Sequence, residues 1–133
     1  MGVKGFTLAE ILITTVILGV IAGLAVPIYS STIELSRSNE AKTSLYVILM
    51  GQKIYKLNSA GQVYNNLGST NVASINSGLN VELLPQYYNT SWNVSAAGSG
   101  VGATFTASVC RGNPGNKCFT IDEAGTPGES GSY

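Results

Sequence analysis

The chain has 133 residues, which suits one domain with a modest core. Its seven basic and seven acidic residues cancel, so no excess of positive charge indicates a nucleic-acid partner. Histidine is absent, which removes the commonest general base and the commonest metal ligand, and we therefore expect neither a catalytic centre nor a metal site.

The N-terminal quarter is strongly apolar. A short polar stretch carries Lys4, and no charged residue occurs between positions 11 and 33. A helix needs about 20 apolar residues to cross a bilayer, so this run is long enough to span one. The sequence therefore predicts a membrane-spanning helix here.

The helical pattern continues beyond Glu34 but becomes amphipathic. Apolar residues recur there at intervals of three, four and seven, with charged residues between them. The apolar positions are Ala41, Leu45, Ile48, Leu49 and Tyr55. The polar run 58–61 supplies a stop signal, so one long helix is expected from residue 6 to about residue 57.

The second half of the chain contains short runs typical of strands. We interpret the polar stretch 65–78 as a connecting loop, and four β-like runs follow it. These runs are 81–84, 92–95, 103–111 and 118–122. Alternation is clearest at 104–110, where Phe105, Ala107 and Val109 share one face. The predicted fold class is α+β, with a small antiparallel sheet packed on the amphipathic half of the helix.

The helix opens on the hexamer Gly5-Phe6-Thr7-Leu8-Ala9-Glu10. A Gly followed by an aromatic residue, Thr, Leu and then Glu, at the start of a charge-free helix, resembles the prepilin processing site of type IV pilins and type II secretion pseudopilins. Ala9 stands where these families more often carry Ile, Val or Leu. The resemblance covers residues 1 to about 57, and the head resembles the pilin fold in architecture only.

The resemblance implies a division of the chain and a sequence of events. Residues 1–5 form a leader peptide, 6–33 a hydrophobic assembly helix, and 34–133 a periplasmic or extracellular head that starts with the amphipathic helix 34–57. At the inner membrane, a prepilin peptidase cuts between Gly5 and Phe6 and methylates the new amine of Phe6. An assembly machinery then builds the subunits into a helical homopolymer.

The chain is accordingly expected to be a structural subunit of a type IV pilus-like filament at the bacterial surface, and not an enzyme. A pseudopilin in the periplasmic filament of a type II secretion system is the alternative within the same family. We lean to the pilus subunit because the head has few charges and is rich in Gly, Ser and Thr.

Glu10 supports assembly on independent physical grounds. A carboxylate inside a membrane segment costs on the order of 2.5–3.5 kcal/mol and needs a partner. No basic residue lies between Lys4 and Arg37, and cleavage removes Lys4. The only partner expected for Glu10 is therefore the Phe6 amine of another subunit, in an ion pair that would fix the axial register of the filament.

Three further positions in the apolar helix are candidate assembly residues. Gly19 and Gly23 would let a neighbouring helix approach closely, although they could equally reflect a flexible membrane helix. Pro27 removes one helical hydrogen bond and predicts a kink.

Cys110 and Cys118 are the only cysteines. Between them, the run Asn-Pro-Gly-Asn at 113–116 is a strong reverse-turn signal. An exported head meets an oxidising compartment, so we expect a disulfide, with two buried thiols as the alternative. A two-residue turn would set Cys110 opposite Phe119, so a bridge requires a bulge or a longer loop.

The tail and two short motifs give weaker signals. Asp122, Glu123 and Glu129 lie in a Gly-rich tail, where some major pseudopilins bind calcium, but a solvated tail is favoured and no cofactor is expected. The tripeptides 89–91 and 93–95 fit the N-glycosylation pattern.

Two other classes of protein remain open. One is a secreted binding protein or enzyme with a signal peptide cut after Ala25, a tolerable small-residue site. Glu10 inside the apolar region argues against it, as does the amphipathic helix beyond the site. The other is a single-pass anchored protein that never polymerises.

The processing site yields a direct prediction. The mature chain should begin at Phe6 with a methylated amine, because the cleavage motif and its apolar context both match the family. Mass spectrometry of the native protein measures this N-terminus. A chain that begins at Met1, Gly2 or Val26 would contradict the prediction.

Overall fold

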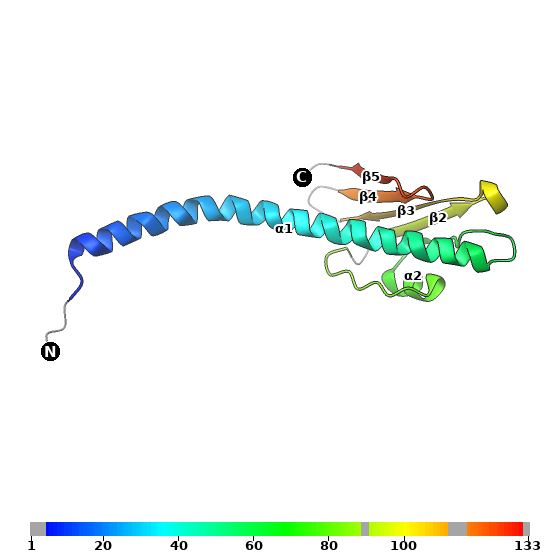
Figure 1. Cartoon of the computed structure of the whole chain (residues 1–133), viewed down its shortest axis with the longest axis horizontal. Helices are drawn as coiled ribbons and strands as arrows, with labels where there is room; N and C mark the ends of the chain where they lie inside the picture. The colour runs from blue at the N-terminus through cyan, green and yellow to red at the C-terminus, as the bar shows by residue number, and fades with distance from the viewer. Residues whose placement is uncertain (1–4, 89–90, 112–116, 132–133) are drawn as a thin grey trace. The chain divides into compact units, whose positions relative to one another are not determined.

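The computed structural model describes residues 5–88, 91–111 and 117–131 (Figure 1). Its helices are α1 (Leu8–Asn58), α2 (Val72–Leu79) and the short 3-10 helix η1 (Gly100–Gly102). Its strands are β1 (Gly68–Thr70), β2 (Trp92–Ala97), β3 (Thr104–Cys110), β4 (Cys118–Asp122) and β5 (Pro127–Ser130). The α+β class is confirmed: a long N-terminal helix precedes a five-stranded antiparallel sheet, an arrangement consistent with the pilin fold.

Three features expected from the sequence lie outside the described residues. They are most of the leader with Lys4, the turn at 113–116, and part of the tripeptide 89–91. The chain forms two compact units that meet between Ser36 and Arg37, and we describe each unit by itself.

The N-terminal unit contains the first part of α1. Every side chain described between residues 5 and 32 is exposed, because no other described segment of the chain covers it. Within the described residues, α1 is the one helix long and apolar enough to cross a membrane by length and composition. The predicted membrane-spanning helix is confirmed to that extent.

The second unit is a head built on the remainder of α1. Four of the five apolar positions predicted for this helix are buried: Ala41, Leu45, Ile48 and Leu49. The fifth is wrong, since Tyr55 is 37% exposed. It lies in the last turn of the helix, beyond the part that packs against the sheet.

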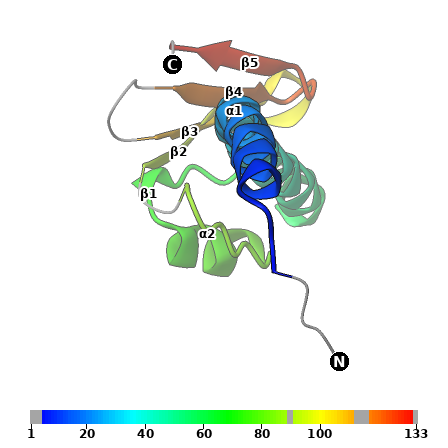
Figure 2. The same cartoon turned by 90° about the vertical axis from the view of Figure 1, so that its left-hand side faces the viewer.

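The sheet supplies the opposite side of the core. Its strands follow one another in the order β1-β2-β3-β4-β5, all antiparallel (Figure 2). Side chains alternate along β2, β3 and β4, and one face is buried against α1. This inward face carries Trp92, Val94, Phe105, Ala107, Val109, Phe119 and Ile121. The predicted shared face of Phe105, Ala107 and Val109 is thus confirmed.

The segment 65–78 is not a simple loop, as we had expected. It contains β1 and most of α2. Asn71 caps α2 by accepting a hydrogen bond from the backbone N–H of Ser74, and Asn80 ends it in the left-handed conformation. Ile75 and Leu79 are buried one helical turn apart in the common core. Asn71, one of the polar residues that suggested a loop, is therefore the N-terminal cap of a helix.

The strand predicted at 81–84 is also wrong. The side chain of Asn76 holds both backbone groups of Leu83, accepting from its N–H at 2.9 Å and donating to its carbonyl at 3.1 Å. Val81 lies directly over the backbone of α1 at Gly51, where any added Cβ would come within 2.8 Å of the valine methyl. The amide of Asn76 thus makes the backbone hydrogen bonds that a neighbouring strand would have made. Gly51 leaves room for Val81 against α1.

Gln52 is a fully buried polar residue of α1 that the periodicity did not identify. Its amide donates to the carbonyl of Asn65 at 2.7 Å and accepts from the N–H of Asn65 at 2.8 Å. The side chain thus satisfies both backbone groups of a residue that belongs to no helix or strand. These two bonds fix the returning chain on α1 before β1 begins.

Replacing Gln52 with Leu should destabilise the head by about 1–3 kcal/mol, because the partly buried backbone of Asn65 would lose both partners. Denaturant unfolding of the full chain in detergent measures this, with fluorescence of the buried Trp92 as the probe. Lys53→Leu, on the exposed side of the same helix, is the control and should change stability by less than about 0.5 kcal/mol. Equal stability of the Gln52→Leu variant and the parent would refute the role of this amide.

Candidate functional site

The peptide bond between Gly5 and Phe6 lies just outside the helix. Residues 5–7 have no regular secondary structure, and α1 begins at Leu8. Gly5 is exposed, and so is Phe6, at 80% of its surface. The predicted cleavage site is therefore an accessible, non-helical peptide directly before a long helix.

Glu10 caps the start of α1. Its carboxylate oxygen Oε2 accepts hydrogen bonds from the backbone N–H and the hydroxyl of Thr7, both at 2.9 Å. In return, the hydroxyl of Thr7 accepts from the N–H of Glu10 at 3.3 Å. This is a capping box, in which a Thr before the helix and a Glu three residues later satisfy donors that have no partner within the helix.

The capping box corrects one expectation about Glu10. The Phe6 amine of another subunit is not its only partner, because Thr7 of the same chain already binds it. The signal was present in the sequence as Thr-Leu-Ala-Glu, a capping-box pattern that we did not use. Both bonds from Thr7 end on Oε2, so the second oxygen of the carboxylate can still accept another donor.

The other candidate assembly residues lie along the exposed part of α1. At Gly19 and Gly23, an added Cβ would have no heavy atom within 4 Å apart from the backbone of its own helix, so the chain itself gives no reason for a glycine there. The helix continues through position 27. The kink expected at Pro27 and the packing role of the two glycines stay predictions.

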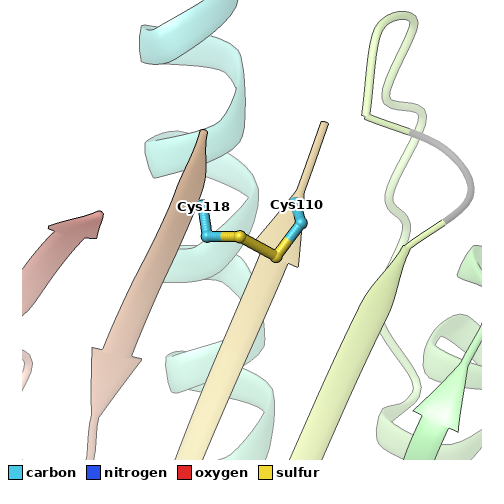
Figure 3. The surroundings of a disulfide bond; sticks show 2 residues. All are labelled: Cys110 and Cys118. Atoms are coloured by element: carbon cyan, nitrogen blue, oxygen red, sulfur yellow. A yellow bond between two sulfur atoms is a disulfide. The ribbon is translucent and has the colours of Figure 1, made fainter. Parts of the chain in front are cut away.

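Cys110 and Cys118 form a disulfide at the ends of β3 and β4 (Figure 3). They are direct partners in the ladder, with Val109 opposite Phe119. The backbone N–H of Arg111 also donates to the carbonyl of Lys117 at 3.0 Å, which extends the pairing one step past the bridge. The cysteines are therefore in register because the connection between them is longer than a two-residue turn. We had expected either a bulge or a longer loop, and the longer loop is the one that fits.

The three carboxylates of the tail bind different partners. Asp122 accepts from the N–H of Thr126 at 2.7 Å, and Glu123 accepts from the N–H of Phe105 at 3.4 Å. Glu129 pairs with lysines on the helix side of the sheet. Within the described residues, no three His, Cys, Asp or Glu side chains gather as a metal site would require.

Glu129 is the centre of an ion-pair network. Its carboxylate is 2.6 Å from the ammonium of Lys117 and 3.5 Å from that of Lys42 on α1. Both ammonium groups also lie over the ring of Phe119, at 5.5 and 5.4 Å from its centroid. The hydrogen bond from Lys117, with the positive charges of both lysines, holds the pKa of Glu129 below its ordinary value of 4.5.

Neither the protein-family models, nor the curated proteins, nor the solved structures with which we compared the chain gave a match.

The ion-pair network predicts a pH dependence of stability. Because the pKa of Glu129 is lower in the folded head than in the unfolded chain, its contribution is complete above about pH 4.5 and is lost as the pH falls through the folded pKa. Glu129→Gln should therefore lower the unfolding midpoint at neutral pH, and the difference from the parent should shrink below pH 4.5.

Denaturant titrations at several pH values measure this difference. Glu82→Gln removes a carboxylate from an exposed position of the head and is the matched control. A difference between the Glu129→Gln variant and the parent that stays constant from neutral to acid pH would show that the network does not act through this carboxylate.

Proposed function

We propose that this chain is a structural subunit of a type IV pilus-like filament, made as a precursor and assembled after removal of its leader. One observation carries the proposal: an accessible prepilin-type cleavage motif leads directly into the charge-free run of α1, whose described side chains are exposed up to residue 32. Exposing a Leu, Ile or Phe side chain costs about 1.5–3 kcal/mol relative to burying it, so this helix requires an apolar environment outside its own chain.

Two apolar environments fit the helix in succession. The charge-free run 11–33 measures about 34 Å at 1.5 Å per residue, which matches the roughly 30 Å hydrocarbon core of the inner membrane. The same surface can pack against identical helices in a homopolymer. The partners are therefore the inner membrane, the prepilin peptidase, the assembly machinery and further copies of this chain, and the chain itself catalyses no reaction.

The geometry of Glu10 supports a role in joining subunits. Cleavage after Gly5 creates an ammonium group at Phe6, and an ammonium in an apolar filament core needs an anion. Glu10 is the one carboxylate in the first 33 residues. Thr7 holds it through Oε2, so the carboxylate is positioned by its own helix while its other oxygen can accept the amine of a docked subunit.

Glu10→Gln should sharply reduce filament formation while leaving the head folded and the leader cleaved. Glutamine keeps the length and the carbonyl oxygen that can accept from Thr7, so the helix cap is retained and only the charge is lost. Leaving the docked amine without its counter-charge should cost about 3–5 kcal/mol per contact, equivalent to a loss of more than a hundredfold. Glu10→Ala should be at least as defective, since it removes the cap as well.

Filament yield is measured by electron microscopy and shear fractionation at matched subunit level, with cleavage verified by mass spectrometry on the same samples. Glu82→Gln, the same substitution on the exposed head, should assemble as the parent does. Normal filaments from Glu10→Gln would show that charge pairing does not join the subunits. A parent chain that is cleaved but forms no filament in any condition would refute the proposed function itself.

A further inference from the structure

Strand β5 forms one edge of the sheet and pairs only with β4 (Figure 2). Pro127, Glu129 and Ser130 are exposed, and no residue of β5 belongs to the buried hydrophobic cluster of the head. The other edge strand, β1, leads into α2, which is anchored in that cluster by Ile75 and Leu79. Burial of apolar side chains therefore stabilises the rest of the head far more than it stabilises β5.

The pairing between β4 and β5 is weakened at two positions. Pro127, opposite Ile121, has no N–H to donate to the ladder. Gly128 lies opposite Thr120, whose hydroxyl occupies the place where a Cβ of residue 128 would stand. Pairs of side chains across neighbouring strands are a main source of sheet stability, and this pair contributes none. The attachment of β5 therefore depends mainly on few backbone bonds and on Glu129.

Glu129 connects β5 to both layers of the head. It lies opposite Phe119 on the helix side of the sheet. Its carboxylate binds Lys117, from the segment before β4, and Lys42 of α1. Lys117 is almost fully buried, so this ion pair is less screened than one between two exposed side chains. We call these two ion pairs of Glu129 the latch.

The latch keeps β5 over a narrow apolar space between α1 and the sheet. Leu45 of α1 lines this space together with Phe119 and Ile121 of β4, and the residues of β5 that line it are Pro127 and Gly128. Removal of β5 would open the space to solvent. It would also free the backbone edge of β4, and an unpaired edge is a template for the addition of another strand.

We propose that β5 is a strap that opens and closes as a unit of its own while the rest of the head stays folded, and that the latch holds it closed. Folded proteins open locally in cooperative units, and segments with few buried apolar contacts open most easily. The turn at 123–126 provides a hinge, in which Gly125 has a φ of 83°. The inference goes beyond the proposed function, because it concerns the head of a single subunit and requires no filament.

Amide hydrogen exchange of the full chain in detergent, followed by NMR, tests the inference. Relative to their intrinsic rates, the amides that bond β4 to β5 should exchange at least about tenfold faster than those that bond β2 to β3. Low concentrations of denaturant should accelerate exchange between β2 and β3 much more than between β4 and β5, because opening of the strap exposes little surface.

Gln52→Leu separates opening of the strap from unfolding of the head. This variant destabilises the folded head at a position distant from β5, so exchange between β2 and β3 should rise at least about fivefold. Exchange between β4 and β5 should stay within about twofold of the parent, because the two bonds of Gln52 persist when only the strap opens. A head that opens only as a whole would show the same rise at both places.

Glu129→Gln tests the latch. Loss of the carboxylate charge should accelerate exchange between β4 and β5 about fivefold or more, whereas Glu82→Gln, at an exposed position of the head, should leave it within about twofold.

A disulfide across the two strands closes the strap by other means. A Cβ at residue 128 would lie 3.7 Å from the Cβ of Thr120, within the roughly 3.5–4.5 Å found in disulfides. In Thr120→Cys/Gly128→Cys, oxidation should slow exchange between β4 and β5 to the rate between β2 and β3, and reduction should reverse the effect. Peptide mapping verifies that the new bond forms beside the one between Cys110 and Cys118.

Equal protection of the two sets of amides in the parent, or an equal rise of both in Gln52→Leu, would show that β5 opens only with the whole head and would overturn the inference. Unchanged exchange in Glu129→Gln would refute the latch. The measurements are made on separate subunits in detergent, so none of these results counts against the proposed function.

Discussion

Apolar side chains on every side of a helix must be removed from water, and the described chain leaves those in the first part of α1 exposed. This part of α1 is long and apolar enough to cross a membrane. This constraint explains the absence of charge between residues 11 and 33, since a single buried ion there would be costly.

The same helix changes character at the start of the head. From Arg37 onward it buries one side against the sheet and binds the connecting segments on its flanks. The carboxylate of Glu40 accepts from the backbone N–H groups of Gln86 and Tyr87, at 2.7 and 2.9 Å. The guanidinium of Arg37 lies 4.7 Å from the ring centroid of Tyr87. Polar side chains in the amphipathic half of α1 therefore bind other segments of the head, including their backbone N–H groups, as well as facing solvent.

Much of the fold could be predicted because its signals are periodic. The alternation in β3 and the 3.6-residue pattern of α1 both follow from one-sided burial, and both were correctly assigned. The errors occurred where a side chain replaced a regular backbone partner. The side chain of Asn71 caps α2, a helix in a segment whose polar composition suggested a loop. The side chain of Asn76 binds the backbone of the segment that we expected to be a strand.

The candidate site shows the same pattern of success and failure. The two cysteines are close in sequence, so their disulfide could be predicted in advance. The cleavage site and the assembly role of Glu10 stay predictions. We expected a charged partner for Glu10 and therefore missed its partner in the same chain. That partner is Thr7, which donates a neutral hydroxyl and a backbone N–H. The network around Glu129 joins residues from α1, β5 and the segment before β4, and only the tertiary structure brings them together.

The order of the strands has a consequence for the timing of folding. Each strand pairs with the next one along the chain, and the connections that join β2, β3, β4 and β5 are short, whereas the connection from β1 to β2 contains α2. Domains dominated by local pairing fold faster than those that depend on distant segments. The pairing within the sheet of the head therefore depends on segments of the same chain, most of them adjacent in sequence.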